Sequence, residues 1–272
     1  AGEGADELFW GYPGYTRVLS HRRVLRALLA SPAFLRRSAS ATVPKRSSPR
    51  LQELMEGIAR GRPLPLHMPL GLTRRQRESM LDSKQPAYSG WSPNDAADGA
   101  KEDPMETLFW DTQEYEFDLR LPELLLMRID RFSMANGVEA RVPFLSPELV
   151  DFVYPLPLRH KWHDGTTKLI LRESIGDLIP DWVMNRPKRG FGAPVEEWFA
   201  GDLQAIFEKL IETDSVKRYF DVEVVRSILN SEGSDGRQAR WSLWSVFNFA
   251  LWHRYWIEGE SIDELLLEAR ST

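Results

Sequence analysis

Carboxylates and glycines share the first residues of the chain, "AGEGADELFWGY". Gly2 and Gly4 flank Glu3, and Asp6 and Glu7 follow directly. Glycine permits backbone conformations closed to other residues and lets a ligand approach closely. Carboxylates in such a turn can bind a hard cation through oxygen or act as a base. The other interpretation is a simple helix start, in which Asp6 and Glu7 complement the helix dipole, and the motif is too short to decide between the two.

Two basic stretches could bind phosphate. In "GTTKLILRESI", Lys168 is expected in the first turn of a helix, where a cation opposes the helix dipole and an anion would compensate it. Backbone N–H groups at a helix start together with a lysine form a ready phosphate site. Further on, "RPKRGFG" places Lys188 between two arginines and beside two glycines, which suits a polyanion. A solvated basic loop is the alternative for this second stretch.

A third stretch, "LPELLLMRIDRFSMANGVEARVPFL" (residues 121–145), mixes apolar and charged side chains. Its apolar residues are expected in the core; they are Leu124, Leu125, Met127 and Met134. Charges among apolar neighbours are usually paired, so structural ion pairs are expected; the charged residues are Asp130, Arg131, Glu139 and Arg141. Glu123, at the start of the expected helix, could complement the dipole or face a substrate. The five histidines show no metal-ligand spacing.

The elements that would position these residues are mainly α-helical. Helical spacing runs from Val18 to Leu29 and stops at Ser31-Pro32, a second helix is expected over residues 51–59, and Thr73 could begin a third. Later helices are expected over residues 104–118, 122–135, 146–154, 166–177, 194–212, 221–230, 238–257 and 261–270. The best candidate for an extended segment is 138–145, while 38–50 and 83–103 are expected to be loops. Ser146 is expected to cap the helix that starts with Pro147 and Glu148.

Composition narrows the functional classes. The 272 residues suffice for one large domain or two small ones, and a net charge of -5 disfavours nucleic acid as the main partner. Without cysteine there is no disulfide, thiolate metal site or cysteine nucleophile. No apolar run approaches the about 20 residues that span a bilayer, and no signal peptide is recognisable, so no membrane partner and a cytoplasmic location are expected. Several of the ten tryptophans cluster near the C-terminus, where aromatic packing is expected.

Taken in order, these stretches resemble the synthetase domain of the glutamine-dependent asparagine synthetase family. The resemblance rests on "GEGADELFWGYPGY", then "LLLMRIDRFSMANGVEARVPFL", then "GTTKLILR" followed by "NRPKRGFGAPVEEW", with a closing "LWSVFNFALWHRYW". It covers nearly the whole chain and is weakest over residues 30–105. Residues 1–272 are therefore expected to be a partial synthetase domain, the helical C-terminal portion of an α/β ATP-pyrophosphatase fold of the adenine-nucleotide α-hydrolase-like type. The resemblance implies that an N-terminal glutaminase domain and a pyrophosphate-binding loop of SGGxDSS type belong to the same protein upstream of Ala1.

The resemblance also implies a reaction and its residues. ATP would activate the side-chain carboxylate of aspartate, and ammonia from glutamine would displace AMP, with ATP and Mg²⁺ as cofactors and a homodimer among the expected assemblies. By motif, Glu3 looks like the acid that handles ammonia, Asp6 like a magnesium ligand, and Lys168 like the lysine on the nucleotide phosphates. Lys188 resembles the lysine that reaches the α-phosphate and the developing oxyanion, and Glu123 falls where relatives often have an acid near the reacting carboxylate. Gly2 and Gly4 are expected to approach the phosphates.

Two positions depart from the family pattern. Trp10 stands where the family usually has glycine; it could narrow the substrate pocket, which leaves the identity of the amino-acid substrate open. Ser146 stands where aspartate is usual and is read as an equivalent helix cap. Two alternatives to asparagine synthesis therefore stay open: a relative that activates another carboxylate, by amidation or cyclisation, and a non-catalytic helical module that binds a nucleotide or a partner protein.

Overall fold

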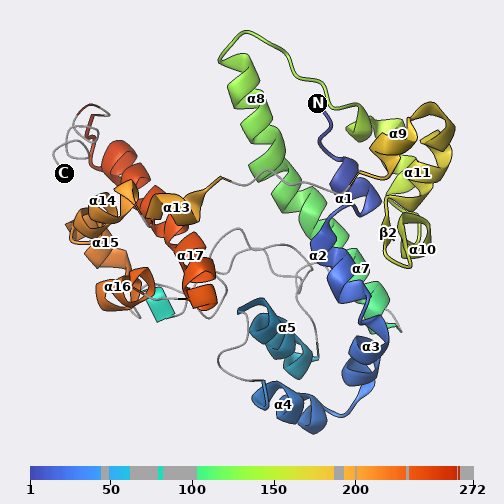
Figure 1. The fold of residues 1–272 in the computed structure, drawn as a ribbon, viewed down its shortest axis with the longest axis horizontal. Coiled ribbons are helices and arrows are strands. Elements are labelled where there is room, and N and C mark those ends of the chain that lie inside the picture. The colour runs from blue at the N-terminus through green and yellow to red at the C-terminus, as the bar shows by residue number, and fades with distance from the viewer. Residues whose placement is uncertain are drawn as a thin grey trace. The chain divides into compact units, whose positions relative to one another are not determined.

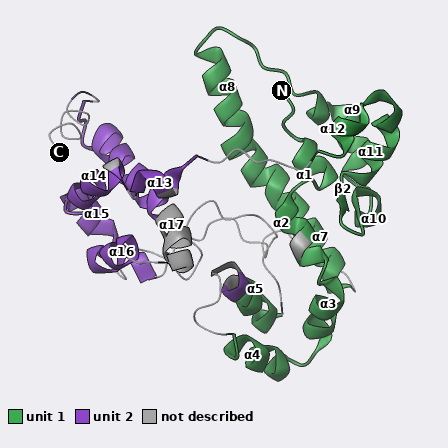
Figure 2. Ribbon diagram, in the orientation of Figure 1, with its two compact units in different colours: residues 1–43, 54–68, 89–189 green, residues 44–53, 69–88, 190–272 purple. Residues whose placement is uncertain are grey.

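The computed structural model describes residues 1–43, 49–61, 79–81, 103–186, 193–199, 201–230, 233–261 and 263. It forms two compact units (Figure 2): unit 1 comprises residues 1–43, 54–68 and 89–189, and unit 2 comprises residues 44–53, 69–88 and 190–272. Helices dominate both units, and the only sheet within the described ranges has two short strands. The prediction of a mainly α chain is confirmed. None of the helices in these ranges is long and apolar enough to cross a membrane.

Unit 1 carries the N-terminal and central elements (Figure 1). Its first helices are α1 (Ala5–Phe9), α2 (Pro13–Leu19), α3 (Arg22–Ala30), α4 (Ala33–Ala41) and the greater part of α5 (Pro49–Arg60). The central run is α7 (Pro104–Tyr115), the π-helix η1 (Glu116–Leu126), α8 (Met127–Met134), the 3-10 helix η2 (Pro143–Leu145) and α9 (Pro147–Val153). It closes with α10 (Leu158–Lys161), β1 (Trp162–His163), β2 (Thr166–Thr167), α11 (Leu169–Ile175), the 3-10 helix η3 (Gly176–Leu178) and α12 (Asp181–Met184).

The N-terminal helices differ in detail from the pattern. The helical run predicted from Val18 to Leu29 divides into α2 and α3, and α3 ends at Ser31 as expected. Residues 38–41, predicted to be loop, continue α4, because alanine and serine there tolerate a helix whose last carbonyls bond to Thr42. Helix α5 confirms the prediction for residues 51–59. The helix predicted from Thr73, apart from residues 79–81, and the loop predicted over 83–103, apart from Asp103, lie outside the described residues.

The longest helical run is α7–η1–α8, which continues through the break predicted between residues 118 and 122. Asp103 caps its start by accepting a hydrogen bond from the Met105 N–H at 3.0 Å, with Pro104 in the first helical position. Pro122 lacks an N–H and would clash with the carbonyl four residues earlier in an α-helix. The wider π-helical turns of η1 accommodate it, so the run does not stop there.

A β-hairpin precedes α11, where the pattern predicts helix from residue 166. Strands β1 and β2 pair antiparallel, and Asp164 (φ 41°) and Gly165 (φ 88°) form the two-residue turn with left-handed backbone. Asp-Gly between two short strands is a hairpin signal, because both residues accept positive φ. Helix α11 therefore begins only at Leu169. The extended segment predicted over residues 138–145 belongs to no strand and ends in η2.

Two hydrophobic clusters are described in unit 1; α1 contributes to one of them and the residue directly after it to the other. Leu8 and Phe9 pack with Val153 of α9, while Trp10, directly after α1, packs with residues of α2, α3 and α7. Helix α1 contacts η1, α9, η2 and α11 as well (Figure 1). The acidic turn at the N-terminus is thus fixed by apolar anchors on two sides.

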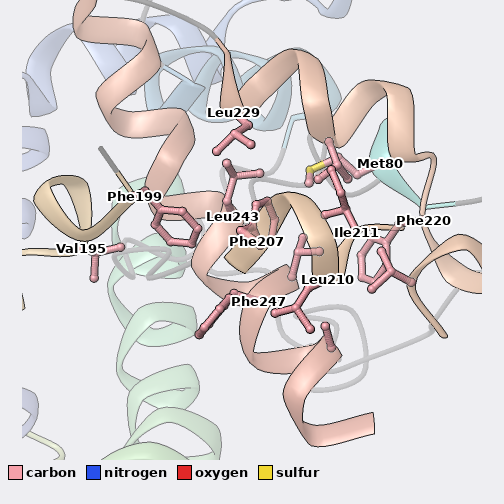
Figure 3. Packing of buried hydrophobic residues seen from close by; sticks show 14 residues of the cluster. Met80, Val195, Phe199, Phe207, Leu210, Ile211, Phe220, Leu229, Leu243 and Phe247 are labelled. Atoms are coloured by element: carbon pink, nitrogen blue, oxygen red, sulfur yellow. The ribbon is translucent and has the colours of Figure 1, made fainter. Parts of the chain in front are cut away.

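Unit 2 is built from α13 (Val195–Phe199), α14 (Asp202–Leu210), α15 (Asp214–Tyr219), α16 (Val222–Leu229), α17 (Gly233–Trp252) and the π-helix η4 (His253–Ile257). They enclose one apolar cluster in which Phe199, Phe207 and Phe247 meet (Figure 3). Trp244 stacks on Phe247 with ring centroids 5.6 Å apart, which confirms the predicted aromatic packing. The helix predicted over 194–212 divides near Gly201, and most of the one predicted over 261–270 lies outside the described residues.

Candidate functional site

The acidic turn begins at two glycines with different surroundings. Gly4 has φ 91°, and a Cβ there would lie 2.4 Å from the Cδ2 atom of Leu145. Its left-handed backbone and this packing both require glycine without any ligand. A Cβ on Gly2 would meet nothing within 4 Å, so the backbone at Gly2 is open to approach. A phosphate contact at either glycine stays a prediction.

Asp6 and Lys168 meet, as the motif predicts. The Nζ atom of Lys168 lies 2.9 Å from Oδ1 of Asp6, and each side chain is 23% exposed. The Lys168 N–H also donates a hydrogen bond to the Phe9 carbonyl at 3.1 Å, so the segment is tied to α1 through its backbone as well. The prediction that Lys168 lies in the first turn of α11 is wrong. Lys168 precedes the helix as its N-cap residue, with φ 54°. The hairpin before it delivers Lys168 to the acidic turn.

Gly11 lies directly beneath this ion pair. A Cβ on Gly11 would fall 1.9 Å from Oδ1 of Asp6 and 2.2 Å from Cε of Lys168. The Gly11 N–H donates to the Asp6 carbonyl at 2.9 Å, which fixes the two residues relative to each other. The pair can form only because residue 11 has no side chain. No pattern in the sequence marks this role, because it depends on a residue far along the chain.

Trp10 is a core residue of the described structure, so the suggestion that it narrows a pocket is not supported. Its side chain is 1% exposed and packs against Tyr15 and Phe109, with ring centroids 4.9 and 4.7 Å away. The residue adopts a left-handed conformation (φ 61°) at the end of α1, a position that favours glycine. That conformation turns the indole into the hydrophobic cluster, where it fills core volume.

A buried polar cluster, which we define as Glu7, Tyr12, Tyr15, Glu116 and Arg120, lies beside α1. The Tyr12 hydroxyl donates to Glu7 and the Tyr15 hydroxyl donates to Glu116. Arg120 lies 2.6 Å from Glu116 and 3.8 Å from Glu7, with its guanidinium 4.4 Å from the centre of the Tyr12 ring. The cluster thus fixes Glu7 and Tyr12, the residues that directly follow Asp6 and Gly11 in the chain. Its members come from α1, α2 and η1, so sequence spacing alone could not have grouped them.

Burial shapes the protonation of this cluster. It raises the pKa values of Tyr12 and Tyr15, and the adjacent carboxylates of Glu7 and Glu116 raise them further. Burial also raises the pKa of Glu116, against the opposing effect of Arg120. For Arg120 burial acts against the charged form, but Glu116 and Tyr12 outweigh it and raise its pKa. Both tyrosines and Arg120 therefore keep their protons at neutral pH.

Lys161 is a buried lysine at the end of α10. It is 0% exposed, and its Nζ donates to Oε1 of Gln113 at 2.7 Å and to the Tyr154 carbonyl at 3.0 Å. Trp10 donates through its indole N–H to the same Gln113 oxygen at 3.4 Å. Among the residues that the structure describes, no carboxylate accompanies Lys161, and burial lowers its pKa to about 7. The sequence offers no signal for this, because "RHKWH" reads as a polar surface turn.

The other predicted site residues are less closely gathered. Oε1 of Glu3 lies 3.8 Å from Arg128 of α8, with the Glu3 side chain 26% exposed. Glu123 lies on η1 and is exposed. Lys188 falls outside the described residues, so its meeting with Asp6 stays a prediction.

The stretch over residues 121–145 is more exposed than predicted. Of its four expected core residues the structure buries Leu125, whereas Leu124, Met127 and Met134 are exposed. The four charged residues expected as buried pairs are also exposed, and Arg141 pairs with Glu139 at 2.9 Å on the surface. The reason is that α8 packs mainly on η1, its own continuation, so most of its sides face outward.

The described residues offer a magnesium ion one carboxylate and not a complete set of ligands. Across the described ranges, no group of three or more His, Asp or Glu side chains could hold a metal. Mg²⁺ is usually bound by one or two carboxylates together with substrate phosphates and waters. Asp6, partly exposed at the edge of the turn, fits the role of such a single carboxylate.

Comparison with known proteins gives a consistent assignment. The chain is 31% identical to a putative glutamine-hydrolysing asparagine synthetase of Mycobacterium tuberculosis (strain ATCC 25618 / H37Rv), over 97% of the chain and 40% of the relative. It is 27% identical to the glutamine-hydrolysing asparagine synthetase 1 of Bacillus subtilis (strain 168), over 98% of the chain and 42% of the relative. A shorter match, 28% identical over 39% of the chain and 17% of the relative, is amidase chyE of Penicillium rubens.

The chain thus spans about 40% of the length of the first two relatives. No solved structure matches it significantly. The family model for asparagine synthase matches residues 1–254, which include the acidic turn, the hairpin with Lys168 and most of unit 2. The chain belongs to the asparagine synthase family.

Proposed function

We propose that the intact protein makes asparagine from aspartate, with ATP as the activating substrate and glutamine-derived ammonia as the nitrogen donor. An oxygen of the aspartate side-chain carboxylate attacks the α-phosphorus of ATP, and pyrophosphate leaves with the electrons of the broken P–O bond. Ammonia attacks the acyl carbon of the resulting β-aspartyl-adenylate, loses a proton and expels AMP. The protein is then a carbon–nitrogen ligase with glutamine as amido donor.

The observation that carries this proposal is the meeting of Asp6 and Lys168 at 2.9 Å. Negative charge gathers at each step, so cations aimed at the phosphates and the oxyanion supply much of the stabilisation. In the proposal Lys168 contacts the nucleotide phosphates, Asp6 binds Mg²⁺, and Glu3 accepts the proton from ammonia. Lys188 reaches the α-phosphate and the developing oxyanion, and Glu123 lies near the reacting carboxylate.

The same proposal covers the remaining expectations from the resemblance. Gly2 and Gly4 border the phosphates, aspartate and ammonia are the partners, and the protein acts in the cytoplasm, with a homodimer among its possible assemblies. Support comes from the names of the relatives and from the geometry of the acidic turn. Because the chain covers about 40% of those relatives, the glutaminase step is proposed for the intact protein and not for these residues.

A second candidate is activation of a different carboxylate. It is favoured by the match to amidase chyE, because the chain also resembles a protein that is named as an amidase and not as an asparagine synthetase. Glu3 favours amidation over ring closure, because lactam-forming relatives resemble this motif with tyrosine at that position. The chemistry at ATP would be unchanged, and only the acid that receives the adenylate would differ.

Exchange of labelled pyrophosphate into ATP by the intact protein tests the proposal. Exchange that depends on aspartate supports asparagine synthesis, exchange that needs another acid supports the second candidate, and no exchange with any acid indicates a non-catalytic module. Lys188→Ala should lower the rate by about 10²–10³, as for other oxyanion donors. The thermal unfolding midpoint of the Lys188→Ala variant should stay near that of the unaltered protein. A large drop in stability with activity retained per folded molecule would show that Lys188 has a structural role.

A further inference from the structure

Under the proposed function, the contact between Asp6 and Lys168 has an unexpected consequence. The carboxylate proposed for a metal ion and the ammonium proposed for phosphate form an ion pair, with Lys168 Nζ 2.9 Å from Asp6 Oδ1. A metal ion approaching Asp6 meets a neighbouring positive charge, and a phosphate approaching Lys168 meets a neighbouring negative one. Each residue therefore weakens the attraction of the other for its own ligand.

We propose that the Asp6–Lys168 ion pair is a counter-charge lock on the nucleotide site. Each residue masks the other until one ligand supplies replacement charges for both, the metal for Asp6 and the phosphates for Lys168. The metal–nucleotide complex does this in one event. Metal-free nucleotide offers a partner to Lys168 alone and must break the pair without compensation at Asp6. This inference rests on the proposed function and adds a selection for metal-loaded nucleotide to it.

The surroundings of the pair suit a contact that opens. Both side chains are 23% exposed, although the contacting Asp6 Oδ1 atom is buried, and an ion pair near the surface is worth about 1 kcal/mol, so ligand binding can outweigh it. The Lys168 backbone stays anchored, because its N–H bonds to the Phe9 carbonyl independently of the side chain. The flexible four-carbon stem can then swing from Asp6 toward a phosphate while the hairpin keeps its place.

Gly11 sets the closed position of the lock. The Cα of Gly11 lies under the pair, and a Cβ there would overlap both Oδ1 of Asp6 and Cε of Lys168. The two charged groups are thus seated against backbone, and the Gly11 N–H holds the Asp6 carbonyl at 2.9 Å. The lock is consequently a defined contact and not an accidental meeting of two long side chains.

The test is binding of ATP to the intact protein by calorimetry, with EDTA present and then with Mg²⁺. The lock predicts that Asp6→Asn binds metal-free ATP more tightly than the unaltered protein, because Lys168 is released. The expected gain is about 2- to 5-fold, the worth of a partly exposed ion pair. With Mg²⁺ the same variant should bind ATP more weakly. A simple metal-ligand role for Asp6 predicts the second effect but no gain without metal.

Two controls separate the lock from a general charge effect. Asp164→Asn removes an exposed carboxylate from the same hairpin, 3.7 Å from Arg22, and should leave metal-free ATP binding nearly unchanged. In the Lys168→Met background, Asp6→Asn should bring no gain, because there is no ammonium to release. Should Asp6→Asn fail to fold, Asp6→Ser gives the same ordering.

The lock is overturned if Asp6→Asn binds metal-free ATP no more tightly than Asp164→Asn, or if the gain survives in Lys168→Met. If the unaltered protein binds no ATP with or without Mg²⁺, both the lock and the proposed function fall. If it binds Mg²⁺–ATP but shows no aspartate-dependent exchange, aspartate is the wrong substrate, and the lock stands or falls with the Asp6→Asn result.

Discussion

The two units have interiors of different composition. Unit 2 encloses one apolar cluster rich in aromatic rings, including Phe199, Phe207 and Phe247. Unit 1 divides its apolar residues into two clusters and inserts charge beside them, with the buried Glu116 and Lys161 as examples. Burying a charge is costly unless it is paired or neutralised.

The difference bears on the proposed site. Buried charge in unit 1 lies next to the acidic turn, so part of its folding free energy serves to hold Asp6 and Gly11 in place. Unit 2 also buries a few polar groups, and its Arg254 pairs with Glu260 at 2.6 Å, but most of its described interior is the single apolar cluster. Substitutions that remove volume should therefore matter most in unit 2, and substitutions that unbalance charge should matter most in unit 1.

The largest effect is expected in the apolar cluster of unit 2. Phe207 is 0% exposed and meets Phe199 edge to face at 5.3 Å. Phe207→Ala should lower the free energy of unfolding by about 3–5 kcal/mol, through lost transfer energy and the cavity left behind. Urea unfolding of the intact protein measures it. Trp256→Ala is the matched control, since that ring is 69% exposed and should change little. Equal losses for both would contradict the account of unit 2.

A slightly smaller loss is expected when charge is unbalanced in unit 1. Arg120→Met leaves Glu7 and Glu116 buried without their guanidinium, which should cost about 3 kcal/mol. Adding Glu116→Gln removes one of the two carboxylates and should recover part of the loss. The recovery is the informative measurement, because a loss due only to the missing arginine stem would not respond to a change at Glu116. Urea unfolding of the single and double variants measures it.

Lys161 makes a pH-dependent prediction for unit 1. Its pKa is about 7 in the folded protein and about 10.5 when unfolded, so between these values the unfolded chain binds more protons. The free energy of unfolding should therefore rise with pH, and the Lys161 contribution between pH 7 and 9 is about 2 kcal/mol. Lys161→Met should lack this rise. A variant with the same pH slope as the unaltered protein would show that Lys161 is charged in the fold.

Local signals in the sequence account for much of the fold. The helices, the stop after α3 and the start of α9 follow from apolar spacing and from prolines. Asp-Gly is a hairpin signal, but the helical pattern directly after it favours a helix, so the sequence alone does not predict the hairpin. The sequence does not predict the π-helix η1, because its wider turns result from Pro122 and from tertiary packing together. For the proposed site, motifs singled out Asp6 and Lys168, which the structure brings together, while their roles stay predictions. The motifs could not identify Gly11, Lys161 or Arg120, whose roles depend on partners chosen by the fold.

The smallest changes in unfolding free energy are expected at helix starts, one in each unit. Asp221 caps α16 in unit 2, accepting hydrogen bonds from the N–H groups of Glu223 and Val224 at 3.1 and 3.2 Å. Ser146 precedes α9 in unit 1, but its side chain makes no capping hydrogen bond, so the predicted cap is wrong in that respect.

Asp221→Ala should therefore cost about 1 kcal/mol of unfolding free energy, the usual worth of a cap. Ser146→Ala should cost less than about 0.5 kcal/mol, the usual range for a surface change that breaks no such feature. Urea midpoints of the two variants, measured side by side, decide it. If Ser146→Ala costs as much as Asp221→Ala, the hydroxyl caps α9 in solution, and the start of α9 follows the sequence signal after all. If both are neutral, packing in each unit and not capping fixes where these helices begin.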